Sequence, residues 1–259
     1  MNRCVSSRGA GAMAKYPLTR LKDTNNLAFV SAPLSAYAGR TRIASGTGFF
    51  YSPSFSRTFL ITNRHVVVKE ATSFYPDALI LKLHTDGDDL TQSSNLTLPL
   101  YSIGQTPTWR QISDSVDVVA LELDTDELKR FVVHAFTPLD MITPDIIVGV
   151  GDPLVVIGYP KGFSDEVHNL PVFRRASVAS VYPIPFGGKP CFLIDSELHP
   201  GTSGSAVITQ PSIWEVNEFE AELFDERRYK FIGVHSASYG DLKLNVVWFA
   251  DLVTELTKE

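Results

Sequence analysis

A short serine segment flanked by glycines is the part of the sequence best suited to covalent chemistry. It reads His-Pro-Gly-Thr-Ser-Gly-Ser-Ala-Val over residues 199–207. Glycines at 201 and 204 favour a tight loop from which the hydroxyl of Ser203 projects. The backbone N–H groups of Gly201 and Ser203 would then point at one spot, which could hold the oxyanion that forms when a serine attacks a carbonyl. An ordinary Gly/Ser turn has the same composition, so the segment alone does not decide between the two.

Two upstream segments carry the residue types that a serine nucleophile needs. Residues 60–68 contain His65, and residues 117–123 begin with Asp117. Histidine can take the serine proton, and a buried carboxylate fixes the imidazole tautomer and stabilises the imidazolium. The chain order His65, Asp117, Ser203 is one of several orders in which such triads occur.

Taken together, the segments resemble the trypsin/chymotrypsin-fold serine proteases, in particular bacterial trypsin-like domains and the high-temperature-requirement proteases. The resemblance rests on five segments in the same order as in the family, namely residues 45–50, 62–67, 117–121, 151–160 and 200–205. It implies Ser203 as nucleophile, His65 as general base and Asp117 as orienting carboxylate. Asp114 is a rival for the acid, but the family pattern places the acid directly before the apolar strand.

The same resemblance implies a specificity pocket. His235 stands where glutamyl endopeptidases and viral chymotrypsin-fold cysteine proteases bind Glu or Gln before the cut bond, although a packed core histidine would fit the same strand. Ser236 and His199 flank the site. Glu197 stands where trypsins carry the aspartate that selects Lys or Arg, and it would repel an acidic side chain. Gln or Glu is therefore the first expectation, and Lys or Arg the second.

Thr202 departs from the vertebrate-type pattern, in which an aspartate precedes the nucleophile and pairs with the new N-terminus after activation cleavage. A threonine cannot form this ion pair. The resemblance therefore implies an enzyme that folds in its active form or is switched by a regulatory protein partner.

Length and composition suit an all-β protein. The chain has 259 residues, of which 44% are hydrophobic, with 17 glycines and 16 prolines for turns. Short apolar runs bounded by Gly and Pro predict strands, the first at residues 27–32. The resemblance implies two packed six-stranded antiparallel β-barrels, at residues 23–136 and 145–259, that form one protease domain. Apolar residues at 249, 252, 253 and 256 predict a C-terminal helix, and residues 212–228 are expected to form an enlarged hairpin.

Charge and cysteine content limit the classes of partner and the cellular compartment that the sequence leads us to expect. The net charge is −6, and all five charged residues among residues 1–22 are basic, which predicts a basic disordered tail. An acidic chain is a poor general binder of nucleic acid, and no run approaches the ~20 apolar residues of a membrane helix. The expected partner is a protein or peptide substrate, with no nucleic acid, membrane, metal or cofactor. With only Cys4 and Cys191, free thiols and a cytoplasmic location are expected.

The leading hypothesis is a serine endopeptidase that works through the triad and an acyl-enzyme. The alternative from another class is a catalytically silent peptide-binding relative that acts in a complex, against which the intact set of three residues argues. An esterase of the α/β-hydrolase type is disfavoured, because residues 201–205 lack the Gly-x-Ser-x-Gly elbow and the acid and base come in the wrong order.

Overall fold

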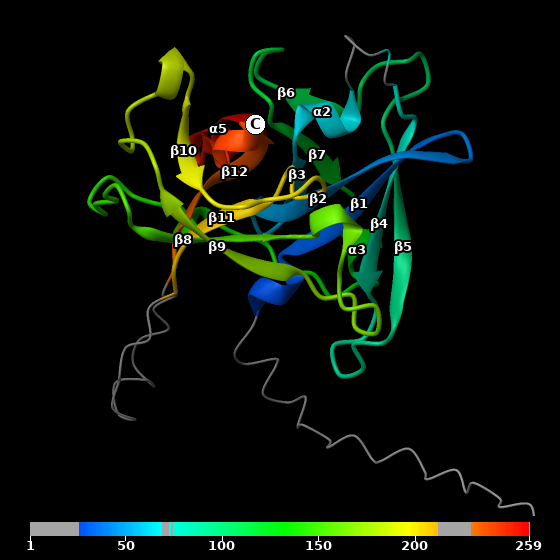
Figure 1. Ribbon diagram of the computed structural model, residues 1–259. Helices are drawn as coiled ribbons and strands as arrows, with labels where there is room; N and C mark the ends of the chain where they lie inside the picture. The colour runs from blue at the N-terminus through cyan, green and yellow to red at the C-terminus, as the bar shows by residue number, and fades with distance from the viewer. Residues whose placement is uncertain (1–25, 69–72, 74, 212–228, 259) are drawn as a thin grey trace, which may run out of the picture.

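The computed structural model describes residues 26–68, 73, 75–211 and 229–258 (Figure 1). Most regular structure in this part of the chain is antiparallel β, arranged as one seven-stranded sheet and one closed six-stranded barrel. In Figure 1 the strands of the first half, coloured blue to green, lie beside the strands of the second half, coloured yellow-green to red. The expected tail at residues 1–22 and the expected hairpin at 212–228 lie outside the described residues.

The first half forms a sheet in the order β5-β4-β1-β2-β3-β7-β6. Its strands are β1 (Ser31–Ala38), β2 (Thr41–Ser54), β3 (Arg57–Thr62), β4 (Ala78–His84), β5 (Ser93–Pro99), β6 (Trp109–Gln111) and β7 (Val119–Leu123). The sequence predicted a closed six-stranded barrel here, whereas the paired residues leave β5 and β6 at the two ends of the sheet. In the segment that connects β5 to β6, one isolated antiparallel bridge pairs Tyr101 with Pro107. Pro99 and Pro107 have no N–H to donate, which limits further pairing.

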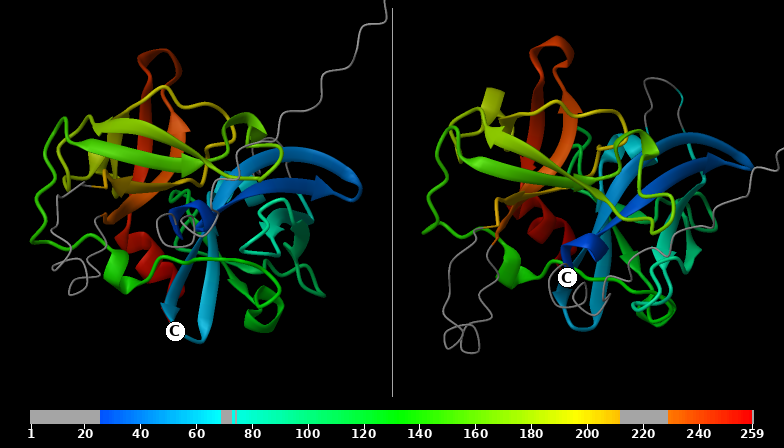
Figure 2. Two further views of the ribbon diagram at one scale, coloured as in Figure 1. Left: turned by 90° about the horizontal axis from the view of Figure 1, so that it is seen from below. Right: turned by 60° about the horizontal axis from the view of Figure 1, so that its bottom comes forward.

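The second half forms the closed barrel β10-β13-β12-β11-β8-β9, as the sequence predicted. Its strands are β8 (Pro153–Gly158), β9 (Val172–Val178), β10 (Cys191–Asp195), β11 (Ala206–Thr209), β12 (Phe231–Ser238) and β13 (Leu244–Phe249). The predicted C-terminal helix is confirmed as α5 (Asp251–Thr257), with Leu252, Val253 and Leu256 buried. Phe249, which the apolar stripe assigned to the helix, is instead the last residue of β13. Views from below place α5 between the orange strands of the second half and the cyan strands of the first (Figure 2).

The remaining helical segments are short. They are η1 (Asn26–Phe29), α2 (Arg64–Val67), α3 (Thr125–Leu128), η3 (Pro138–Asp140), η4 (Pro160–Gly162), η5 (Phe186–Gly188) and η6 (Gly240–Leu242). The strand predicted at 27–32 therefore begins as a turn of 3-10 helix and becomes a strand only at Ser31. Cys191 is a free, buried thiol. Among the described residues, no helix combines the length and apolar character that crossing a membrane requires.

Strand alternation builds three apolar layers, because successive side chains point to opposite faces of a strand. In β2 and β3, Phe50 and Leu60 point into the core of the first half, whereas Phe49 and Ile61 point between the halves. The layer between the halves contains a cluster of Phe49, Phe136 and Phe231, whose ring centroids lie 5.1–5.8 Å apart. This shared layer fixes the two halves against each other, and with them the loops that carry the polar residues discussed next.

Candidate active site

His65 is presented by the turn that follows β3. The chain leaves the strand after Thr62 and forms the four-residue helix α2, whose Val66 and Val67 are buried and anchor it. The side-chain amide of Asn63 donates a 2.7 Å hydrogen bond to the carbonyl of Asp117, which ties this turn to the start of β7. The two segments that the sequence singled out, 52 residues apart, are therefore held together.

Asp117 and His65 form a close pair. The imidazole Nδ1 lies 2.6 Å from Oδ2 of Asp117, and the backbone N–H of His65 donates to Oδ1 at 2.9 Å. The hydroxyl of Ser236 donates a third hydrogen bond, 2.5 Å long, to Oδ2. Burial alone would raise the pKa of Asp117, but the hydrogen bonds and charge of His65 and the Ser236 hydroxyl outweigh it and lower the pKa below its ordinary value. Asp117 is thus held ionised and fixes Nδ1 as the donor, which leaves Nε2 as the basic nitrogen.

The rival acid, Asp114, lies in a different environment. Its side chain is 81% exposed and accepts hydrogen bonds of 3.0 Å from Arg64 and from Gln111. The structure therefore places Asp117, and not Asp114, against His65.

The serine loop between β10 and β11 is held by Thr47 of β2. The backbone N–H of Thr47 donates to the carbonyl of Ser203 and its hydroxyl donates to the carbonyl of Gly201, both at 2.8 Å. Gly204 lies so close to β2 that a Cβ there would be 2.1 Å from the carbonyl of Thr47, and its φ is +85°. Only glycine fits this position without moving backbone, which explains the Ser-Gly pair in the sequence.

The residues before Ser203 form a tight turn that frees two N–H groups. Thr202 donates from its N–H to the carbonyl of His199 at 3.2 Å, and Gly201 has a φ of +96°. A positive φ at the third position is what a type II turn requires. Within the described residues, neither the N–H of Gly201 nor that of Ser203 donates a hydrogen bond. Both remain available to hold a developing oxyanion.

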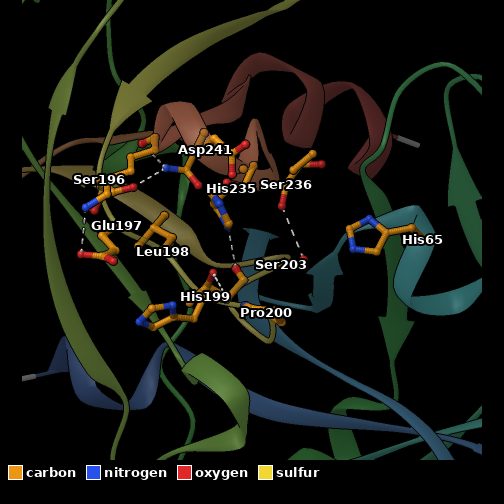
Figure 3. A pocket seen from close by; sticks show the side chains of 16 residues that line it. His65, Ser196, Glu197, Leu198, His199, Pro200, Ser203, His235, Ser236 and Asp241 are labelled. Atoms are coloured by element: carbon orange, nitrogen blue, oxygen red, sulfur yellow. Dashed lines mark hydrogen bonds and ion pairs between the residues drawn. The ribbon is translucent and has the colours of Figure 1, made fainter.

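Ser203 and His65 line one cavity of about 970 Å³ between the halves. Figure 3 shows His65 on one side of it, with Ser203 near the centre and Glu197 and His199 on the far side. The hydroxyl of Ser203 donates to the carbonyl of Ser236 at 3.4 Å, and no hydrogen bond joins it to His65 within the described residues. Contacts of this kind often tighten only when substrate is bound. The arrangement can carry out nucleophilic attack on a carbonyl once the serine hydroxyl turns toward His65.

Residues 46–215 match the family model described as the trypsin-like peptidase domain. The chain belongs to this family. The match covers both members of the His65–Asp117 pair and the serine loop, and it ends before β12, which carries Ser236 and His235.

Solved structures show the same fold for this peptidase domain. A serine endoprotease from Yersinia pestis is 14% identical with a TM-score of 0.54, and the match covers 88% of this chain and 61% of that one. The HtrA-type protease AlgW with tripeptide is 15% identical with a TM-score of 0.55, covering 88% and 58%. A protease from M. tuberculosis in its active form is 17% identical with a TM-score of 0.50, covering 99% and 92%. The chain thus spans about three fifths of the length of the first two proteins. No curated protein sequence gives a significant match.

The residues predicted to determine specificity lie at two places in the cavity, one buried at its end and one exposed at its rim. His235 is 3% exposed, lines the cavity, and places Nδ1 2.9 Å from the carbonyl of Thr202. Glu197 is a rim residue whose side chain is 61% exposed and lies 3.5 Å from the ammonium of Lys243. Glu197 therefore does not occupy the buried position that an aspartate has in trypsins. His199 is half-buried and also lines the cavity.

Sequence reasoning missed two residues of the site. Thr47 braces the serine loop, and its only signal was its place between Gly46 and Gly48. Asn245 is fully buried on β13 and lines the same cavity as His235. The sequence feature that could have revealed Asn245 is a single amide side chain in an otherwise apolar strand. Within the described residues, no group of three or more His, Cys, Asp or Glu side chains gathers in a way that could hold a metal ion.

Proposed function

We propose that the chain is a serine endopeptidase in which Ser203 is the nucleophile, His65 the general base and Asp117 the orienting carboxylate. The observation that carries the proposal is the 2.6 Å pair of His65 and Asp117, whose His65 lines the same cavity as Ser203. The family to which the chain belongs supports the same reaction class.

The geometry divides the reaction into two steps. The hydroxyl of Ser203 attacks the substrate carbonyl and gives its proton to Nε2 of His65, because Nδ1 is held by Asp117. The oxyanion is held by the N–H groups of Gly201 and Ser203, a role in which one donor typically lowers the barrier by about 3–4 kcal/mol. The imidazolium then protonates the leaving amine, and an acyl-enzyme on Ser203 remains. A water activated by His65 hydrolyses the ester and restores the serine.

The side chain before the cut bond would enter the cavity toward His235. On this basis the peptidase would prefer Gln or Glu, because the buried imidazole offers a polar partner at the end of the cavity. Lys or Arg is the second choice, and its support is now weaker because Glu197 is exposed and paired with Lys243.

Covalent labelling with a fluorophosphonate probe tests the proposed nucleophile directly. We expect labelling of the intact protein and none of Ser203→Ala, with His65→Ala folded but strongly slowed. Turnover of a peptide substrate by Ser203→Ala would refute the assignment.

The silent peptide-binding relative is favoured by one observation, the hydrogen bond of Ser203 to Ser236 in place of His65. Peptide binding without labelling would support that second candidate.

A further inference from the structure

The turn before Ser203 has two forms that its own hydrogen bond does not distinguish. The N–H of Thr202 donates to the carbonyl of His199, and this bond closes a type I turn as well as a type II turn. The two forms differ by a rotation of the central peptide, which here joins Pro200 to Gly201. The φ of +96° at Gly201 is that of the type II form. Because the carbonyl and the N–H of a trans peptide point in opposite directions, the Pro200 carbonyl decides where the N–H of Gly201 points.

The Pro200 carbonyl is held by the backbone of another loop. The N–H of Lys161, in η4, donates a 2.5 Å hydrogen bond to it. Gly201 packs against the same loop, and a Cβ there would lie 2.7 Å from the nitrogen of Lys161 and 2.8 Å from the carbonyl oxygen of Tyr159. The bond from Lys161 therefore selects the type II form, in which the N–H of Gly201 is turned away from η4 and can hold an oxyanion.

The loop that holds this carbonyl is strained at Lys161. Its φ is +54°, in the left-handed region that a residue with a Cβ rarely adopts. A residue persists in such a conformation only where the surrounding structure fixes it. The orientation of the Pro200 carbonyl therefore depends on the contacts that anchor the segment 159–169, which contains Lys161, to the rest of the protein.

Asn169 anchors the far end of the segment 159–169. Its side-chain amide donates a 3.0 Å hydrogen bond to the carbonyl of Lys82 in β4 of the first half. Its own carbonyl accepts a 3.1 Å bond from the hydroxyl of Tyr159, the residue that precedes η4. Asn169 is 4% exposed and has a φ of +52°, which asparagine tolerates better than most residues. One buried side chain thus joins the first half to the loop behind the oxyanion turn.

Two further contacts hold the same segment against the first half. Nε2 of His84, also in β4, lies 2.5 Å from the carbonyl of His168, and the N–H of Tyr159 donates to the hydroxyl of Thr47 at 3.0 Å. A carbonyl only accepts, so Nε2 of His84 is the donor in the first contact. Both ends of the segment are therefore held by strands of the first half, although the turn that the segment orients belongs to the second half.

We infer that Asn169 is a positioning residue for the oxyanion site. By anchoring the segment 159–169 to β4, it keeps the N–H of Lys161 on the Pro200 carbonyl and so keeps the N–H of Gly201 directed at the reacting carbonyl oxygen. The inference rests on the proposed serine endopeptidase function and adds to it a residue that is not among the described residues lining the cavity. Asn169 acts through the turn and makes no contact with the reacting atoms.

Asn169→Asp tests the inference in the full chain. Aspartate keeps the shape of the side chain and tolerates a positive φ, but its carboxylate cannot donate to the carbonyl of Lys82. With a peptide substrate, we expect kcat to fall about tenfold, short of the roughly 100- to 1,000-fold that loss of one oxyanion donor costs. KM should change less than about threefold, because the oxyanion forms only after the substrate is bound.

Inhibition by a peptide aldehyde gives a readout that a merely structural role would not move. The oxygen of Ser203 adds to the aldehyde carbon, the serine proton passes to His65, and the aldehyde oxygen takes the oxyanion position. Asn169→Asp should weaken the aldehyde by the same factor as kcat and leave the affinity for the matching peptide alcohol, which forms no adduct, unchanged. A structural role would lower the folded fraction and leave both affinities of the folded protein as they are.

The matched control is Asn95→Asp, the same change at an exposed position of β5, which should alter none of these quantities. In folded Asn169→Asp, an unchanged kcat, a rise in KM alone, or a fall in kcat without a fall in aldehyde affinity would overturn the inference. If Asn169→Asp does not fold, Tyr159→Phe decides, since it removes the hydroxyl bound to the carbonyl of Asn169. The paired fall should recur, and its absence would refute the role. Absence of hydrolysis and of fluorophosphonate labelling in the wild-type protein would instead overturn the serine endopeptidase function.

Discussion

The backbone N–H of Thr47 in the first half donates a 2.8 Å hydrogen bond to the carbonyl of Ser203 in the second half. The Thr47 hydroxyl adds a bond to the carbonyl of Gly201 and accepts one from the N–H of Tyr159. Thr47 lies on β2, which pairs with β3, and His65 comes shortly after β3 in the chain. One buried residue therefore sets the distance between the base, carried by the first half, and the nucleophile, carried by the second.

Thr47→Val removes the hydroxyl and keeps the shape of the side chain. Two buried groups, the carbonyl of Gly201 and the N–H of Tyr159, lose a partner, which should lower the free energy of unfolding by about 1–3 kcal/mol for each. A small shift of the serine loop should reduce kcat by about 100-fold. Chemical denaturation and peptide hydrolysis measure the two effects. Thr97→Val, at an exposed position of β5, is the control, and equal effects of the two changes would contradict the bracing role.

Asp117→Asn should reduce kcat on the order of 10⁴-fold, because an amide no longer fixes the imidazole tautomer that leaves Nε2 basic. The matched change Asp114→Asn removes an exposed carboxylate that contacts Arg64 rather than His65. It should leave kcat within about threefold of the parent protein, in line with the small worth of exposed ion pairs. Peptide hydrolysis at saturating substrate separates the two. A larger loss for Asp114→Asn would show that the wrong acid has been assigned.

Those parts of the site that depend on local pattern could be read from the sequence. His65, Asp117 and Ser203 each stand beside an apolar run that folds as a buried strand or turn, and the family pattern chose Asp117 over Asp114. The closed barrel of the second half was implied by the family resemblance, and the C-terminal helix followed from the periodicity of its apolar residues.

The features that the sequence did not predict depend on contacts between distant residues. Asn245 matters because of its bond to Ser196, 49 residues earlier, and nothing near it in the chain points to that bond. Glu197 has the right spacing from Ser203 for a pocket acid, but Lys243 and solvent hold it at the rim. The open edge of the first sheet likewise depends on pairing across the segment between β5 and β6, where Pro99 and Pro107 remove donors.

Gly204→Ala should abolish cooperative folding or lower the melting temperature by far more than backbone strain alone. The new Cβ would lie 2.1 Å from the carbonyl of Thr47, and backbone would have to move. Gly104→Ala is the control, since Gly104 has a φ of +101° and nothing within 4 Å of the added carbon. Its cost should be limited to strain of about 1–3 kcal/mol. Thermal denaturation compares them, and similar losses would show that the contact with Thr47 is unimportant.

The preference between glutamine and glutamate substrates should change with pH. The pKa of His235 lies below the ordinary value of 6.5, mainly because of burial. Above that pKa the ring offers a lone pair, which glutamine satisfies and glutamate does not. As the pH falls through it, Nε2 gains a proton and becomes a donor that a carboxylate can accept. The ratio of kcat/KM for Glu to that for Gln should therefore stay low above pH 6.5 and rise once the pH falls below the lowered pKa of His235.

Using a ratio separates His235 from the other titrating groups around it. His65, whose charge disfavours the charged His235 ring, and Asp117, whose charge favours it, take part in the same chemical step for both substrates, so the contribution of that step cancels in the ratio. Glu197, Asp241 and Lys243 at the rim are exposed, and their effect should weaken as salt is added, whereas that of a buried imidazole should persist. The His235→Gln variant, which has no imidazole, should show a ratio that varies less with pH than that of the wild-type protein. Identical pH profiles of the ratio for the two proteins would mean that His235 does not read the substrate side chain.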